Sequence, residues 1–305
     1  MSRYFFIAFL LVVFAGCTNE TETPSAPEYN TELLQRIRAA ASIIPGPFPT
    51  GIGYLKFSES IRKWSEVIEG GSEDPCKMAR TAFQIHYPDG WVMVDAGMDR
   101  QVHKFFEKEK PQPFDDAKAD RVRQAVEGAR LVLITHEHGD HVAGVIRTAN
   151  TGGVPHKTLL TREQADALMT RPQMPEIKLG VPESRQYLIA SFESLLPVAP
   201  GLVLIKAPGH TPGELMIYAR LQNGKEYLFT GDVSWSYQGI AEKKGKPEND
   251  QKRIGENASL VNSQLAWLNQ LLTKEKVTLL VSHDDIMLPQ YAAQGLIADT
   301  ISVGR

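Results

Sequence analysis

The sequence has few of the features that stabilise very small proteins or that mark nucleic-acid-binding proteins. Only two cysteines, Cys17 and Cys76, occur among its 305 residues, which excludes a framework of several disulfides. Cys76 follows the turn-like run Gly-Gly-Ser-Glu-Asp-Pro, so we expect a partly buried, unreactive thiol. The formal net charge is -3 without a long run of lysine or arginine, so the basic surface that nucleic acid requires is missing. Hydrophobic residues make up 42% of the chain, which is enough to stabilise one large domain or, less favourably, two small ones.

The N-terminus indicates export. The apolar run from Tyr4 to Ala15 is too short to cross a bilayer as a stable helix, but behind Arg3 it is typical of a signal-peptide core. The segment Phe14-Ala15-Gly16-Cys17 resembles the bacterial lipobox, in which the cysteine is acylated and becomes the new N-terminus. Residues 18–28 are rich in Thr, Glu, Pro and Ser, as in a flexible tether. We expect an exported bacterial lipoprotein, anchored in the periplasm or cell envelope through Cys17 alone; an ordinary secretory signal is the alternative.

Hydrophobic periodicity predicts alternating strands and helices. Residues 79–87 and 91–95 indicate two strands around the hairpin signal Pro88-Asp89-Gly90, whereas residues 54–68 fit either a strand or a helix. Four short apolar runs are typical of buried strands: 131–134, 202–205, 227–229 and 277–281. Helical spacing covers residues 31–41, 101–108, 116–127, 141–149, 162–169 and 258–272. The alternation predicts a layered α/β domain.

The strongest chemical signal follows the predicted strand 131–134 directly. It reads Thr135-His136-Glu137-His138-Gly139-Asp140-His141 and places three histidines and an aspartate within six positions. Imidazole nitrogen and carboxylate oxygen are the ligands that zinc accepts where thiolates are absent. Because alternate residues of a loop point the same way, His136 and His138 can share one metal while Asp140 and His141 face a second.

Three further candidate ligands also follow predicted strands. His210 lies in Pro208-Gly209-His210-Thr211-Pro212-Gly213, Asp232 in Thr230-Gly231-Asp232 and His283 in Ser282-His283-Asp284. In α/β sheets, ligands bind outside the carboxyl ends of the strands, so these loops are expected to converge. The other histidines lack this context and are expected at the surface: His86, His103 and His156.

These motifs, in this order, resemble the metallo-β-lactamase fold superfamily over roughly residues 51–305. The resemblance implies an αββα sandwich, with two facing mixed sheets flanked by helices and the site at one edge. It also implies a ligand set for two zinc ions, with iron or another divalent metal as alternatives: His136, His138 and His210 for the first, Asp140, His141 and His283 for the second, and Asp232 as the bridge. Asp95 matches a superfamily aspartate that supports the metal loops from behind.

The chemistry implied is hydrolysis without a protein nucleophile. Two zinc ions can share a water whose pKa falls towards about 7, so that a bridging hydroxide attacks a carbonyl carbon. Asp140 is the expected catalytic residue, orienting the hydroxide and passing its proton to the leaving group. A serine hydrolase is disfavoured because the chain has no Gly-x-Ser-x-Gly elbow.

Residues around the bridging aspartate favour one branch of the superfamily. The true β-lactamases lack an aspartate corresponding to Asp232, and glyoxalase II follows it with Gly-Cys-Gly-Arg, whereas this chain has Val233-Ser234-Trp235-Ser236-Tyr237. The resemblance is therefore closest to lactonases that open N-acyl-homoserine lactones. These often carry a tyrosine where Trp235 stands, so Trp235 or Tyr237 is expected to contact a small-molecule substrate.

Other activities of the same fold remain open at this stage. They are an iron-dependent redox enzyme resembling persulfide dioxygenases, a β-lactamase and a phosphodiesterase. A non-catalytic binding module is disfavoured because no ligand is lost. The expected organisation is a lipoprotein signal peptide at 1–17, a tether and lead helix at 18–44 and the catalytic domain at 45–305, with substrate choice depending on the loops 43–53, 170–184 and 234–257.

Overall fold

The computed structural model describes residues 26–107, 110–148 and 153–304. The predicted signal segment 1–17, with Cys17, and the first part of the tether lie outside the described residues. The strands are β1 (Gly51–Lys63), β2 (Pro75–Tyr87), β3 (Gly90–Val94), β4 (Leu131–Leu133), β5 (Thr158–Thr161), β6 (Leu188–Ala190), β7 (Leu195–Ala199), β8 (Leu202–Lys206), β9 (Leu215–Arg220), β10 (Glu226–Phe229) and β11 (Val277–Leu280). The α-helices are α1 (Thr31–Ala40), α2 (Arg100–Glu107), α3 (Asp116–Gly128), α4 (Gly139–Arg147), α5 (Arg162–Thr170), α6 (Val181–Ser184), α7 (Tyr237–Glu242), α8 (Glu248–Ile254), α9 (Ala258–Lys274) and α10 (Met287–Ala293).

The strands form two mixed sheets. The first sheet has the order β1-β2-β3-β4-β5-β6 and the second the order β11-β10-β9-β8-β7. In the first sheet, β1, β2 and β3 pair antiparallel and β3 to β6 pair parallel. In the second, only β10 and β11 pair parallel. All strands of the first sheet precede those of the second along the chain.

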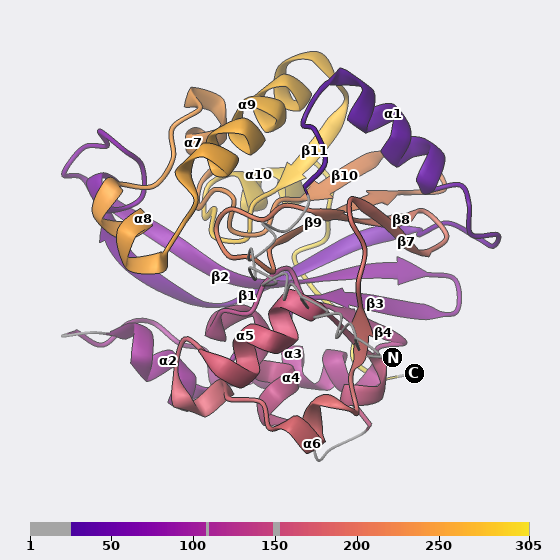
Figure 1. The fold of residues 1–305 in the computed structure, drawn as a ribbon, viewed down its shortest axis with the longest axis horizontal. Helices are drawn as coiled ribbons and strands as arrows, with labels where there is room; N and C mark the ends of the chain where they lie inside the picture. The colour runs from indigo at the N-terminus through magenta and orange to yellow at the C-terminus, as the bar shows by residue number, and fades with distance from the viewer. Residues whose placement is uncertain (1–25, 108–109, 149–152, 305) are drawn as a thin grey trace, which may run out of the picture.

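Helices cover the outer face of each sheet (Figure 1). Helices α2 to α6 lie on the side of the first sheet, and α1, α7 and α9 lie on the side of the second. Apolar side chains fill three layers accordingly. One core joins α3, α4 and α5 to the first sheet, another joins α1 and α9 to the second, and the third lies between the sheets. Because each sheet buries both faces, its strands read as apolar runs rather than as alternating patterns. The predicted αββα sandwich is confirmed.

Most of the predicted elements are present. The hairpin around Asp89 and the predicted helices appear within a few residues of their expected bounds, and the ambiguous segment 54–68 is mainly strand β1. Two of the segments treated as loops contain helices: α6 lies within 170–184, and α7 and α8 lie within 234–257. None of the helices in the described part of the chain is long and apolar enough to cross a membrane.

The expectation that His103 lies at the surface is wrong. Its ring is fully buried, with Nδ1 3.1 Å from the Ser58 hydroxyl and Nε2 3.1 Å from the Gln112 carbonyl oxygen. Two polar partners on opposite sides of the ring satisfy it without solvent. His156 is exposed and His86 is half-buried.

Candidate metal centre

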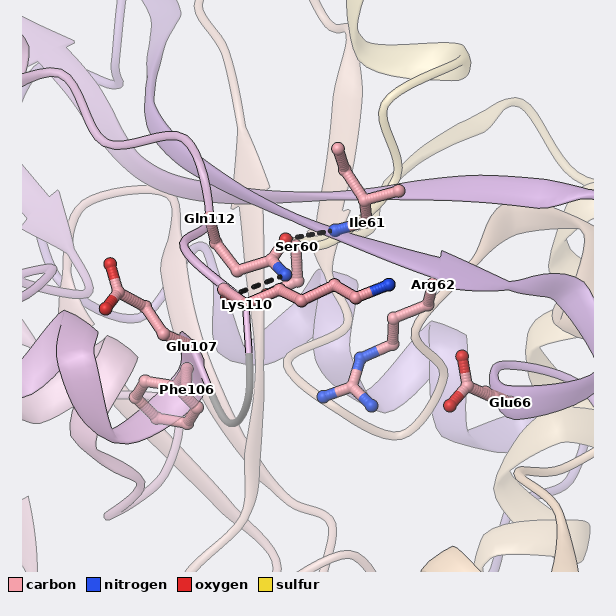
Figure 2. Close-up of a pocket in the computed structure, with 8 residues that line it drawn as sticks. All are labelled: Ser60, Ile61, Arg62, Glu66, Phe106, Glu107, Lys110 and Gln112. Carbon is pink, nitrogen blue, oxygen red and sulfur yellow. Dashed lines mark hydrogen bonds between the residues drawn. The ribbon is translucent and has the colours of Figure 1, made fainter.

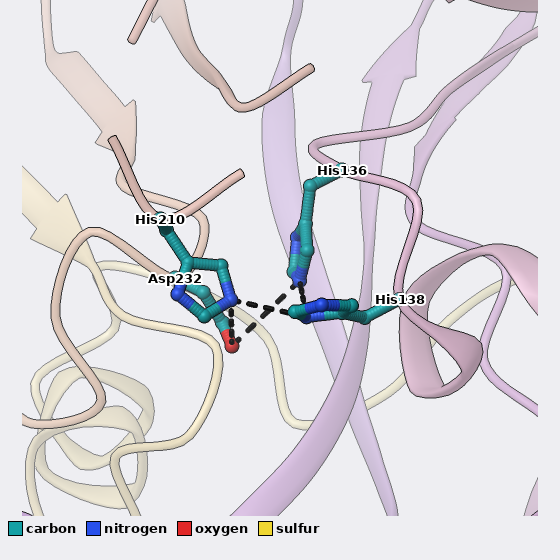
Figure 3. Close-up of side chains that lie close together, drawn as sticks. All are labelled: His136, His138, His210 and Asp232. Carbon is teal, nitrogen blue, oxygen red and sulfur yellow. Dashed lines mark hydrogen bonds and ion pairs between the residues drawn. The ribbon is translucent and has the colours of Figure 1, made fainter. Parts of the chain in front are cut away.

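All seven predicted ligands gather in two adjacent groups. The first contains His136, His138, His210 and Asp232, and the second contains Asp140, His141 and His283; within each group the ligand atoms lie within 4.8 Å of one another. Figure 3 shows the three rings of the first group pointing towards one another and towards the Asp232 carboxylate. Residues separated by as much as 147 positions thus meet at one place.

In the first group, one nitrogen of each ring faces a common point. His138 Nδ1 lies 3.1 Å from His136 Nε2 and 3.0 Å from His210 Nε2. Asp232 Oδ2 lies 3.6 Å from His210 Nε2 and 3.8 Å from His136 Nε2. Three nitrogens and one oxygen at such spacing can surround a single cation.

The second group uses the other oxygen of Asp232. Asp232 Oδ1 lies 3.5 Å from His141 Nε2 and 3.1 Å from His283 Nε2, which also lies 3.2 Å from Oδ2. Asp140 Oδ2 lies 3.7 Å from each of these two nitrogens. Asp232 therefore presents one oxygen to each group, which is the arrangement expected of a carboxylate that bridges two cations.

Strand ends deliver these side chains. The loop with His136 and His138 joins β4 to α4, whose first turn carries Asp140 and His141. His210 follows β8, Asp232 follows β10 and His283 follows β11. Because both sheets end their relevant strands at one edge, loops from the two sheets face each other there. The convergence expected from the sequence is what the structure contains.

The second nitrogen of most of these rings contacts an acceptor, which leaves the first free to bind metal. His141 Nδ1 lies 2.8 Å from Asp95 Oδ2, and His210 Nδ1 lies 2.9 Å from Glu256 Oε2. His283 Nδ1 lies 2.6 Å from the Ala79 carbonyl oxygen, and His136 Nδ1 lies 3.1 Å from the Thr135 hydroxyl. The rings are therefore oriented by the protein itself.

Asp95 is placed directly behind the metal loops. It is fully buried after β3 and has φ 64°, a left-handed conformation that is uncommon for a residue other than glycine. Besides His141, its carboxylate accepts hydrogen bonds from the Thr135 backbone N–H at 2.8 Å and from the Thr135 hydroxyl at 3.0 Å. Asp95 thus ties the end of β3 to both ends of the loop that carries the histidines.

The electrostatics of the centre favour a bound cation. Burial lowers the pKa values of His136 and His210, and lowers that of His138 to about 3, so these rings are neutral. Burial also acts to lower the pKa of His141, but the carboxylates of Asp140, Asp95 and Asp232 outweigh it and raise the value to about 10. Negative charge at the second group is thus strong enough to hold a proton where a metal would otherwise bind.

The residues fit a pair of zinc ions. His141 Nε2 and Asp232 Oδ1 are buried and have no hydrogen-bond partner among the described residues, although both point into the centre. Buried polar atoms without partners are costly, and a bound cation would satisfy them. A set of imidazoles and carboxylates without thiolates suits zinc and also other divalent transition metals.

A cavity of about 230 Å³ opens over the centre. Ligands from both groups form its floor, and five apolar side chains contribute to its wall: Met78, Phe105, Phe106, Trp235 and Ile254. The indole N–H of Trp235 donates to Asp232 Oδ2 at 2.8 Å, so Trp235 presents its ring rather than its donor to the cavity. Tyr237 is not among the residues that line this cavity; its backbone N–H donates to Asp284.

Several residues of the centre were not predicted from the sequence. Arg80 forms a buried ion pair with Asp140, Glu214 accepts from the Asp232 backbone N–H at 3.0 Å, and Lys246 donates to Glu256 at 2.8 Å. Glu214 directly follows the Pro-Gly-His-Thr-Pro-Gly run, which is a signal that could have been used. Arg80 and Glu256 lie far along the chain from their partners, in segments without a distinctive motif.

Comparison with known proteins agrees with this geometry. N-acyl homoserine lactonase from Bacillus sp is 24% identical over 164 residues, which cover 54% of this chain and 59% of that protein. Uncharacterized protein YobT from Bacillus subtilis (strain 168) is 33% identical over 132 residues, covering 39% and 52%. The chain thus spans little more than half the length of these curated relatives.

The fold is shared with solved structures as well. A structure of an N-acyl homoserine lactone hydrolase with the product N-hexanoyl-L-homoserine bound at its metal centre has a TM-score of 0.63 and 16% identity, over 80% of this chain and 96% of that one. The family model for the metallo-beta-lactamase superfamily matches residues 79–283, a span that begins within β2 and ends at the last metal-ligand candidate. The chain therefore belongs to the metallo-β-lactamase superfamily.

Proposed function

We propose that the protein is a dizinc hydrolase that opens lactones or cleaves related carboxylic esters, with N-acyl-homoserine lactones as the first candidates. The observation that carries this proposal is Asp232, which presents one oxygen to each of two complete groups of ligands. The lactonases among the relatives and the shared fold support the choice of substrate class.

When bound, two zinc ions supply Lewis acidity towards a carbonyl oxygen and lower the pKa of a water towards about 7. The protein's own contribution is orientation. Burial opposes ionisation of Asp140, but Arg80, His141 and His283 outweigh it and hold its pKa at about 2. Asp140 is therefore an ionised acceptor at the cavity floor, where it can orient the attacking water and carry its proton to the departing alkoxide.

The cavity suits a substrate with both a polar reacting centre and an apolar part. Phe106 and Ile254 offer apolar contact in the same cavity as Asp140 and His283. Because Trp235 donates its only polar hydrogen to Asp232, we propose that it fixes the bridging carboxylate and bounds the cavity, rather than donating to the substrate carbonyl.

The test is a hydrolysis screen of the zinc-loaded protein on N-acyl-homoserine lactones, simple esters, phosphodiesters and a β-lactam. We expect ring opening of lactones, and its loss in Asp232→Ala and His138→Ala with the far-ultraviolet circular dichroism unchanged. His156→Ala, an exposed histidine, is the matched control and keeps full activity. Full activity in Asp232→Ala would refute the mechanism, and one iron per chain with no hydrolysis of any substrate would favour the redox alternative.

A further inference from the structure

Three arginines line the cavity above the metal centre, and they differ in how their charges are satisfied. Arg80 pairs with Asp140 and donates to the Ser60 hydroxyl at 2.9 Å. Arg253 pairs with Asp250 at 2.5 Å. The guanidinium of Arg62 has neither an ion pair nor a hydrogen bond with any residue that the structure describes, and its Nε is buried.

The surroundings of Arg62 make this lack of a partner costly. Burial lowers its pKa, and the neighbouring charges of Arg80 and Arg253 lower it further, whereas Asp250 and Glu66 oppose this effect from beyond ion-pair distance. Arg80 also has a buried Nε without a partner among the described residues. Arg62 is half-buried, and the partly desolvated charge of a guanidinium that lacks a partner is stabilised when an anion binds to it.

Arg62 stands where the metal cavity meets a second one. It lines the cavity over the metal centre and also a neighbouring cavity of about 240 Å³, and Phe106 is the other residue shared by both. Figure 2 shows the Arg62 side chain directed among the residues that line the second cavity, which include Glu66 and Lys110. A substrate whose carbonyl lies at the metal centre can therefore extend along Phe106 and end at Arg62.

The charges around the metal cavity also favour an anionic ligand. The seven ligands include two carboxylates, Asp140 and Asp232, so two bound divalent cations would bring more positive charge than these ligands carry negative charge. Arg62 adds to that charge, whereas Arg80 and Arg253 are paired with Asp140 and Asp250. An electrostatic field of one sign in a cleft concentrates ligands of the opposite sign.

We propose that Arg62 binds an oxyanion of the substrate, a carboxylate or a phosphate, so that the preferred substrates are esters or lactones that carry a negative charge remote from the reacting carbonyl. This inference rests on the proposed hydrolase function and shifts its preferred substrates from uncharged lactones, such as the N-acyl-homoserine lactones, to esters or lactones that carry an anionic group. The planar guanidinium can donate two parallel hydrogen bonds to such a group, a geometry that a lysine cannot reproduce. The apolar wall with Phe106 accommodates the short chain between carbonyl and anion.

The test compares matched substrates that differ in one charge. The substrates are mono-4-nitrophenyl glutarate, its neutral methyl ester and the analogue in which a phosphonate replaces the carboxylate. We expect the zinc-loaded wild-type protein to show a kcat/KM for at least one anionic ester that is about tenfold or more above that of the neutral ester. Because the interaction is electrostatic, the ratio should fall as ionic strength rises. A larger ratio for the phosphonate or for the carboxylate identifies which oxyanion is preferred, and either supports the proposal.

Variants assign the preference to one side chain. In Arg62→Met the ratio should fall to about one, mainly through KM, and Arg62→Lys should restore part of it. Arg185→Met is the matched control, since Arg185 is exposed beside α6, away from the residues that line the cavity. It makes the same change in charge and should keep the wild-type ratio.

A binding measurement separates this inference from the proposed function. Calorimetric titration of the zinc-loaded protein with glutarate should give an affinity about tenfold lower in Arg62→Met than in wild type, whether or not any ester is hydrolysed. Hydrolysis of both esters at equal rates by wild type would overturn the role of Arg62 and leave the hydrolase intact. Absence of hydrolysis together with loss of glutarate affinity in Arg62→Met would refute the hydrolase and retain the anion site; an unchanged affinity would overturn the anion site.

Discussion

Replacing Asp95 by asparagine tests how the metal centre is organised. The substitution keeps the size of the side chain, and asparagine tolerates the left-handed conformation at φ 64°. One oxygen remains to accept from the Thr135 backbone N–H, which lies 2.8 Å from Asp95 Oδ1. The amide nitrogen, however, would replace Oδ2, which now accepts from His141 Nδ1 at 2.8 Å.

Two N–H donors cannot face each other, so His141 must adopt the other tautomer. Its proton then lies on Nε2, the nitrogen that points towards Asp232 and Asp140, and that nitrogen can no longer bind metal. Loss of such a supporting contact typically weakens metal binding by about 10–100-fold. The cost to the free energy of unfolding is smaller, about 1–3 kcal/mol for one buried hydrogen bond.

Competition with a fluorescent chelator measures both affinities, and urea unfolding of the metal-free chain measures stability. We expect Asp95→Asn to bind one zinc ion almost normally and the second about 10–100-fold more weakly. Asp89→Asn, in the exposed turn between β2 and β3, is the control and should bind both ions as wild type does. If each site bound zinc as tightly in Asp95→Asn as in wild type, Asp95 would not be the residue that orients His141.

Three other outcomes follow from the same structure. Arg80→Met leaves Asp140 as a buried carboxylate without its partner and should lower the free energy of unfolding of the metal-free chain by about 3–5 kcal/mol in urea, whereas Arg100→Met, which breaks an exposed pair, should leave it unchanged. Burial raises the pKa of Cys76 from 9.0 to about 11, so its thiolate form is about a hundredfold scarcer at pH 8. A disulfide reagent should therefore label the native chain at least a hundredfold more slowly than the unfolded chain. Equal labelling rates would contradict the burial of Cys76. If Cys17 carries a lipid as proposed, Cys17→Ser should move the protein from the membrane to the soluble fraction, and Cys76→Ser should not.

The sequence predicted the helices of eight or more residues and several of the buried strands, but it missed β5 and β9 although both are largely buried. Strands β4, β8, β10 and β11 were visible because both of their faces are covered, which makes them continuous apolar runs. Strands β6 and β7 were not, since they are edge strands whose side chains are only partly buried. A three-residue strand such as Leu188–Ala190 carries too little pattern to be distinguished from a loop.

The candidate site likewise contains residues that the sequence predicted and residues that it did not. The ligands were predictable because they follow strands in recognisable short motifs. Their supporting residues were not, since Glu256 reaches His210 across 46 positions and Arg80 reaches Asp140 across 60. His103 was misjudged for a similar reason: its partner Ser58 lies 45 positions away. Contacts of this kind depend on how the elements pack, which no local pattern records.

The order of the two sheets along the chain gives the metal centre a mechanical consequence. His136, His138, Asp140 and His141 follow a strand of the first sheet, and His210, Asp232 and His283 follow strands of the second. Because Asp232 is shared, each cation would be bound by two side chains from the first layer and two from the second. Zinc binding would thus stabilise the packing of the two layers against each other. At a free zinc concentration a thousand times the dissociation constant, each site would add about 4 kcal/mol to the free energy of unfolding. A fragment that contains one layer alone would lack part of the ligand set of each cation.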